Sequence, residues 1–224
     1  MVAASRKLVA KSTAFRQMAR EQQRAMKIIG LLGGVASGKS LVARLLAELG
    51  AGVLDADQAG HQVLELPHIM AAARQRWGEA IFGADGKIDR HKLARIVFAP
   101  GEQGERERRF LEELTHPEIG RLLSAQAQQY ADNGKKAAVL DAALLLEAGW
   151  DKLCRILVFV DAPLESRQKR ALQRGWTTEE FIAREAAQLP IEQKRARADL
   201  IIDNSAAVEY TREQVERLWQ SLGD

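Results

Sequence analysis

The segment from Gly33 to Ser40 has glycine, lysine and serine at a spacing suited to holding phosphate groups. It reads Gly-Gly-Val-Ala-Ser-Gly-Lys-Ser and fits the pattern G-x-x-x-x-G-K-S. Glycines let such a loop wrap closely, so that successive backbone N–H groups point at the phosphates of a nucleotide. Lys39 is expected to contact the β- and γ-phosphates of ATP, and the Ser40 hydroxyl to ligate Mg²⁺. All eight residues are predicted to bind the nucleotide: Gly33, Gly34, Val35, Ala36, Ser37, Gly38, Lys39 and Ser40.

Two carboxylates, Asp55 and Asp57, follow the next apolar run of the chain. Side chains alternate between the two sides of an extended chain, so both are expected on one side, facing the phosphates. One carboxylate is then suited to accept a proton from an acceptor hydroxyl, and the other to order Mg²⁺-bound water. The alternative is that both are polar loop residues that cap the next helix.

Further charged groups lie later in the chain. Asp141 closes the apolar run 137–140 and is a candidate Mg²⁺ ligand at the end of a strand beside the phosphate loop. Capping of a following helix is the alternative. Arg170 and Arg174 are four residues apart, so they share one helix face and are suited to stabilise the charge of a phosphate in transfer. A solvated helix face is the alternative for this pair.

Five short apolar runs are predicted as the strands that position these groups: 27–32, 52–55, 137–141, 155–160 and 199–202. Helical patterns separate them, which is typical of a parallel sheet covered by helices. The fold class is therefore predicted as α/β with a five-stranded, mostly parallel sheet, in which the second strand lies beside the first. The glycine-rich loop joins the first strand to a helix that ends at Gly50.

Two long helical stretches complete the predicted organisation. The first, from about 60 to 133, is expected to be a helical insertion in the α/β core. Within it His116 and Pro117 indicate a helix start, because proline is favoured in the first helical turn. The second, from about 163 to 195, carries Arg170 and Arg174. Residues 26–224 are thus predicted to form one elaborated domain.

Composition excludes several classes of protein. Hydrophobic residues make up 46% and charged residues 28% of the chain, which is ordinary for a soluble protein. No apolar run approaches the roughly 20 residues that cross a bilayer, so no membrane partner is expected. The single cysteine and four histidines show no zinc-ligand spacing. We therefore expect neither a membrane protein nor a zinc protein.

The net charge of +3 is concentrated at the start of the chain, where residues 1–25 carry six Lys and Arg against one Glu. The remainder is slightly acidic, so no nucleic-acid partner is expected. Binding of nucleic acid through this basic leader is the alternative, and it predicts steep salt dependence. The leader itself is predicted to be disordered or an extension from an upstream start codon or from cloning, with a transit peptide as the alternative.

These motifs together resemble the dephospho-coenzyme A kinase family, from Met26 to about Asn204. The resemblance rests on the glycine-rich loop and on a series of motifs that follow it in order: Asp55-Ala56-Asp57, Asp89-Arg90 before Leu93 and Phe98, His116-Pro117, Leu144-Leu145-Leu146-Glu147, Arg170 with Arg174, and Ala198-Asp199 through Asp203-Asn204. Where the family usually has Pro-Leu-Leu-Phe-Glu, this chain has Ala-Leu-Leu-Leu-Glu at 143–147.

The resemblance implies a P-loop kinase that transfers the γ-phosphate of ATP to the ribose 3′-hydroxyl of dephospho-coenzyme A. It implies that Asp57 is the base and that the region of Asn204 lies near the adenine. With Asp57 as the base, Asp55 joins Ser40 and Asp141 as the residues expected to serve Mg²⁺. The resemblance also implies that the helical insertion binds the acceptor, that His116, Leu145 and Glu147 contact it, and that the arginine-bearing helices form a lid. We expect a cytoplasmic monomer or weak homo-oligomer.

Two alternatives remain open on the sequence. A shikimate- or gluconate-type kinase can also place an Asp-x-Asp sequence after the glycine-rich loop, although no matching acceptor signature follows here. A nucleotide-dependent regulatory module would use the loop to drive a conformational switch, with the carboxylates only positioning Mg²⁺.

Overall fold

The computed structural model describes residues 26–222, so the predicted basic leader lies outside the described residues. The chain divides into two compact units. Among the described residues, unit 1 consists of 26–54 and 124–222, and unit 2 of Asp55–Leu123. In the described part of the chain, no helix is long and apolar enough to cross a membrane.

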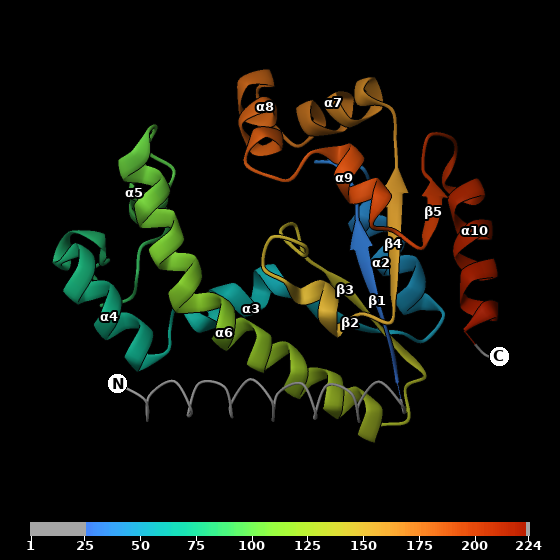
Figure 1. Ribbon diagram of the computed structural model, residues 1–224, viewed down its shortest axis with the longest axis horizontal. Coiled ribbons are helices and arrows are strands. Elements are labelled where there is room, and N and C mark those ends of the chain that lie inside the picture. Colours follow the sequence, from blue (N-terminus) through green and yellow to red (C-terminus); the bar gives the residue numbers. More distant parts are fainter. Residues whose placement is uncertain (1–25, 223–224) are drawn as a thin grey trace. The chain divides into compact units, whose positions relative to one another are not determined.

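The sheet has five strands, which confirms the predicted α/β fold (Figure 1). They are β1 (Lys27–Leu32), β2 (Gly52–Asp55), β3 (Ala137–Asp141), β4 (Ile156–Asp161) and β5 (Leu200–Asp203), in the order β2-β3-β1-β4-β5. β1 pairs in parallel with β3 and β4, and β4 pairs in parallel with β5. The prediction that the second strand lies beside the first is wrong, because β3 lies between them. The acidic end of β3, rather than that of β2, is therefore next to β1.

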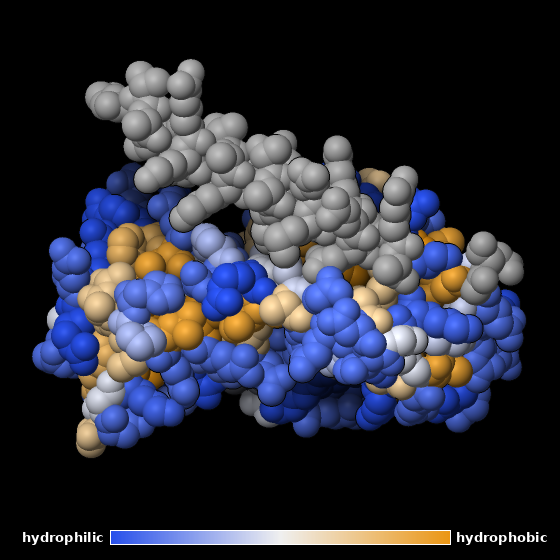
Figure 2. Space-filling model, turned by 90° about the horizontal axis from the view of Figure 1, so that it is seen from below, coloured by the Kyte–Doolittle hydropathy of each residue, from blue (hydrophilic) through white to orange (hydrophobic). Residues whose placement is uncertain are grey.

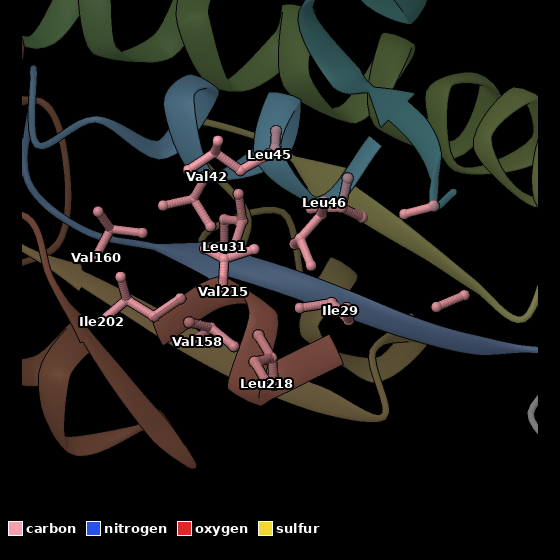
Figure 3. Close-up of a cluster of buried hydrophobic side chains, with 14 residues drawn as sticks. Ile29, Leu31, Val42, Leu45, Leu46, Val158, Val160, Ile202, Val215 and Leu218 are labelled. Carbon is pink, nitrogen blue, oxygen red and sulfur yellow. The ribbon is translucent and has the colours of Figure 1, made fainter. Parts of the chain in front are cut away.

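A continuous apolar core holds α2 (Lys39–Glu48) and α10 (Val208–Ser221) against one face of the sheet. Figure 3 shows Ile29 and Leu31 of β1 between side chains of these two helices. Ile29, Leu31 and Leu46 are fully buried. Each side chain of this kind stabilises the fold by about 1.5–3 kcal/mol when it leaves water. This packing fixes the end of β1 and the start of α2, between which the glycine-rich loop lies.

The helical stretch predicted from about 163 to 195 consists of three helices (Figure 1). They are α7 (Leu164–Gln173), α8 (Thr178–Ala186) and α9 (Ile191–Ala196). Gly175, with a φ of 80°, turns the chain after α7. Thr177 and Glu180 then form a capping box at the start of α8. Pro190 precedes α9 as its N-cap residue. Local turn and cap residues thus divide a stretch whose charge pattern alone is continuous.

Unit 2 consists of α3 (Ala56–Val63), α4 (Pro67–Trp77), a 3₁₀ turn η1 (Glu79–Ile81), α5 (Arg90–Val97) and the first part of α6 (Glu102–Asp132). Its own small core includes Ala73, Ile81, Phe82, Leu93 and Val97. In Figure 2, polar residues cover most of the visible surface and apolar residues reach it in several places. The prediction that His116 and Pro117 start a helix is wrong, because Pro117 lies inside α6.

Candidate active site

The glycine-rich loop leads from the end of β1 into the first turn of α2. Gly38, with a φ of 104°, is the N-cap residue of α2 and has the left-handed conformation that favours glycine. A Cβ atom at Gly38 would also collide with the side-chain amide of Asn204. The start of α2 therefore has the loop geometry that the spacing predicts, with backbone N–H groups at a helix N-terminus.

Ala36 is the only non-glycine residue with positive φ among residues 26–222, at 57°. An alanine pays a conformational cost of roughly 1 kcal/mol for this left-handed position. Val35 and Ala36 are buried in a small apolar cluster with Ala171 and Phe181, against which Trp176 packs. The middle of the loop is therefore held by side chains of α7 and α8.

The Lys39 ammonium group lies against the loop from which it comes. Its Nζ donates to the carbonyl oxygens of Gly34 at 3.3 Å and of Gly33 at 3.5 Å. Lys39 also lines a narrow cleft with Gly33, Leu145, Glu147 and Lys194. A positive charge at this point is suited to the phosphates of a nucleotide.

Ser40 and Asp141 come together at the carboxyl end of the sheet. The Ser40 hydroxyl donates to Oδ2 of Asp141 at 2.9 Å. Asp141 pairs with Leu31 in the register of β1 and β3, so it lies at the end of the strand that neighbours the loop. The helix-capping alternative for Asp141 is wrong, because turns rather than a helix follow it.

This pair fits Mg²⁺ better than a transition metal, since both groups offer oxygen atoms. Among residues 26–222, no group of three or more His, Cys, Asp and Glu side chains could hold a metal ion. Mg²⁺ needs no such cage, because it is commonly held by one or two protein oxygens together with water and substrate phosphates.

Asp55 and Asp57 do not alternate along one strand. β2 ends at Asp55, which is the N-cap residue of α3, and its Oδ1 accepts a hydrogen bond from the Gln58 N–H at 2.9 Å. Asp57 lies in the first turn of α3. The prediction of an extended chain through both residues is wrong, and the capping alternative holds for Asp55. Both residues belong to unit 2, and their catalytic roles stay predictions.

Arg170 and Arg174 differ in their contacts. Arg170 donates from Nη1 to the Ser37 carbonyl at 2.9 Å and from Nη2 to the Asn204 carbonyl at 2.8 Å. Arg174 is the C-cap residue of α7, is exposed, and has its guanidinium carbon 5.8 Å from the centre of the Trp176 ring. Arg170 therefore supports the loop backbone directly, whereas Arg174 is exposed at the end of α7 and its catalytic role stays a prediction.

Asn204 is a buried support of the loop. Its Nδ2 donates to the Ser37 carbonyl at 2.7 Å, and its Oδ1 accepts from the Thr211 hydroxyl at 3.0 Å. Both ends of the amide are thus bonded to protein groups, which favours a positioning role for this side chain over a direct contact with adenine.

The predicted acceptor-binding residues lie in different surroundings. Leu145 is buried in unit 1. Glu147 accepts from the Leu189 N–H at 2.8 Å and pairs with the buried Lys194, whose Nζ is 3.5 Å away. His116 lies on the unit 2 part of α6, where burial lowers the pKa of its imidazole. Their contacts with an acceptor stay predictions.

Three charged residues of the helices α7 to α9 were missed by sequence reasoning: Arg167, Glu185 and Lys194. Arg167 is buried and pairs with Glu185, and the Lys194 ammonium has a lowered pKa because it is buried. In the sequence these residues belong to a run of mixed charge, which usually means a solvated helix. Only the fold separates the buried members from the exposed ones.

The family model for dephospho-CoA kinase matches residues 27–209 of this chain. The chain belongs to the dephospho-CoA kinase family. A family member from Symbiobacterium thermophilum is 42% identical over 200 residues, which cover 88% of this chain and 81% of that protein. The dephospho-CoA kinase of Aquifex aeolicus is 40% identical, with 88% and 98% of the two chains covered.

Solved structures agree with this family. The crystal structure of a Thermus thermophilus protein aligns with a TM-score of 0.74 and 34% identity, over 88% of this chain and 98% of that one. Dephospho-CoA kinase from Campylobacter jejuni aligns with a TM-score of 0.59 and 25% identity, again over 88% and 98% of the two chains. The dephospho-CoA kinase assignment thus extends over nearly all of the described residues.

Proposed function

We propose that this chain transfers the γ-phosphate of ATP to the ribose 3′-hydroxyl of dephospho-CoA, which gives CoA and ADP in the last step of CoA biosynthesis. The family match over residues 27–209 carries the proposal. The glycine-rich loop supports it, because Lys39 lies against the loop and Ser40 bonds Asp141 at the neighbouring strand end. The activity is that of an ATP-dependent phosphotransferase with an alcohol acceptor.

The loop residues Gly33 to Ser40 bind the phosphates of ATP through backbone N–H groups and Lys39 in this proposal. Ser40, Asp141 and Asp55 are the groups that hold Mg²⁺, which offsets negative charge on the phosphates when it is bound. Arg170 and Asn204 act through the loop, because both side chains donate a hydrogen bond to the Ser37 carbonyl. In this proposal Arg174 is the lid arginine that stabilises the charge of the transferred phosphate.

Unit 2 and the helices α7 to α9 take the acceptor-binding and lid roles in this proposal. Asp57 accepts the proton of the 3′-hydroxyl, and His116, Leu145 and Glu147 position the acceptor. The enzyme is cytoplasmic, where ATP is supplied, and acts as a monomer or weak homo-oligomer without a nucleic-acid partner. Residues 1–25 are not part of the catalytic machinery.

Incubation with ATP, Mg²⁺ and dephospho-CoA, followed by mass spectrometry, tests the proposal. CoA should form in equal amount to ADP, and the Lys39→Ala variant should form neither above background. Shikimate and gluconate serve as alternative acceptors in parallel reactions. Turnover of either in place of dephospho-CoA would contradict the assignment, and ADP release independent of any acceptor would favour a regulatory module.

A further inference from the structure

An ion pair between α7 and α8 forms hydrogen bonds with the backbone of the glycine-rich loop at Val35. Nη1 of Arg167 on α7 lies 2.5 Å from Oε1 of Glu185 on α8. The same Glu185 oxygen accepts from the Val35 N–H at 3.3 Å, and Arg167 Nη1 donates to the Val35 carbonyl at 3.4 Å. Both backbone polar groups of Val35 are therefore bonded by this one pair.

Val35 directly precedes Ala36, whose backbone is strained at a φ of 57°. A non-glycine residue keeps this left-handed backbone conformation only where contacts with the surrounding structure enforce it. Arg167 also lies close to the residue before Val35, since a Cβ atom added at Gly34 would lie 2.6 Å from its Nη1. Arg167 and Glu185 thus contact the loop at Gly34 and Val35, the two residues before Ala36.

The pair is placed to act on the backbone and not on a phosphate. The Arg167 side chain is only 6% exposed and that of Glu185 is 32% exposed, so salt screens the pair less than a surface pair. The Arg167 guanidinium also lies over the Phe181 ring, with 5.6 Å between its central carbon and the ring centre. Its charge is directed at Glu185 and the Val35 carbonyl.

We propose that Arg167 and Glu185 are positioning residues for ATP binding, which hold Ala36 in the left-handed conformation and so keep the following N–H groups arranged for the phosphates. The inference rests on the proposed use of ATP and adds two residues that act through the loop. It also makes the loop conformation depend on where α7 and α8 lie.

Calorimetric titration with ATP tests this role in the full chain, with the melting temperature measured beside it. Glu185→Ala should weaken ATP binding by about tenfold, in line with loss of a hydrogen bond to a charged group. The double variant Arg167→Met/Glu185→Ala removes the unpaired buried charge as well, so it should regain melting temperature without regaining affinity. Glu192→Ala, an exposed change on α9, is the matched control and should stay within about twofold of wild type.

Ala36→Gly supplies the decisive comparison, because glycine adopts positive φ without strain. In the Glu185→Ala background it should recover about threefold or more of the lost affinity, and in the wild type it should change affinity by less than about twofold. Strictly additive effects, or a folded Glu185→Ala variant with wild-type affinity, would overturn the positioning role alone. A wild-type chain that does not bind ATP would overturn the proposed function, and the positioning role with it.

Discussion

At the scale of single residues, Asp57 carries the sharpest mechanistic prediction. Asp57→Asn keeps the size of the side chain but removes the proton acceptor, so the chemical step should slow by about 10²-fold or more if Asp57 is the general base. ATP binding should be unchanged. Single-turnover measurement of CoA formation checks this result. Activity within about threefold of wild type would locate the base elsewhere.

Asp55→Asn is the control for that variant. The Asp55 carboxylate caps α3, and an asparagine oxygen can accept the same hydrogen bond from Gln58. We therefore expect Asp55→Asn to fold normally and to change chiefly the Mg²⁺ dependence, whereas added Mg²⁺ should not restore Asp57→Asn. Equal losses in the two variants would favour a shared electrostatic role.

Asp141 carries a second prediction at this scale. Asp141→Asn keeps an oxygen that can accept from Ser40 but removes the negative charge that attracts Mg²⁺. The Mg²⁺ concentration for half-maximal activity should rise by about tenfold, which corresponds to about 1.4 kcal/mol. Titration of activity with Mg²⁺ at saturating ATP measures this. An unchanged midpoint would remove Asp141 from the metal site.

Some of the site residues could be predicted from the sequence, and others could not. The loop from Gly33 to Ser40 was predictable because its glycines and its Lys-Ser pair are required by local geometry and charge. Asp141 was predictable because an apolar run ended on an acid. The conformation at Asp57 was not, because nothing in the alternating pattern indicates that the extended chain ends two residues earlier.

At the scale of elements, α4 and α6 are joined through one buried carboxylate in unit 2. Glu107 accepts from Arg76 Nε at 2.8 Å, from Arg76 Nη2 at 2.9 Å and from Trp77 Nε1 at 2.9 Å. The hydrogen bonds from Arg76 are the main cause of the lowered pKa of the Glu107 carboxyl. The ionised form is therefore the one that ties the two helices together.

This tie should depend on pH in a defined direction. The folded-state pKa of Glu107 is lowered, so the ionised carboxylate raises the free energy of unfolding at every pH above the unfolded-state pKa of about 4.3. This stabilisation is lost as the pH falls through the folded-state pKa. Glu107→Gln should lower the free energy of unfolding by about 2 kcal/mol at pH 7. It should also remove the loss of stability at acid pH that is due to Glu107. Hydrogen exchange of α4, with Glu113→Gln on the exposed side of α6 as control, measures both effects.

The elements themselves were predictable to different degrees. Strand positions were predicted within a residue or so, because short apolar runs between Gly, Asp and Asn have few other structures available. The order of the strands was not, since it depends on packing between distant segments. Pro117 was mistaken for a helix start because a long helix that tolerates an internal proline looks, in sequence, like two shorter ones.

At the scale of the whole molecule, the described fold begins with β1 at Lys27, and the family match begins at the same residue. A chain that starts at Met26 should therefore keep its melting temperature within about 2 °C, an order typical of changes away from packed features. It should also keep its kinetic constants. A large loss of stability would show that the leader packs on the rest of the chain.

The central place of β1 in the sheet has a consequence for synthesis of the chain. β1 leaves the ribosome before the other four strands, yet both of its neighbours, β3 and β4, begin more than a hundred residues later. Unit 2 is contiguous and emerges complete while β1 still lacks either neighbour. Closing so long a loop is slow and leaves apolar strand surface exposed meanwhile. Nascent chains stalled after Leu123 has emerged, but before Ala137 emerges, should thus have helical protection in unit 2 and an unprotected β1. A chaperone could bind the apolar side chains of β1 during this interval.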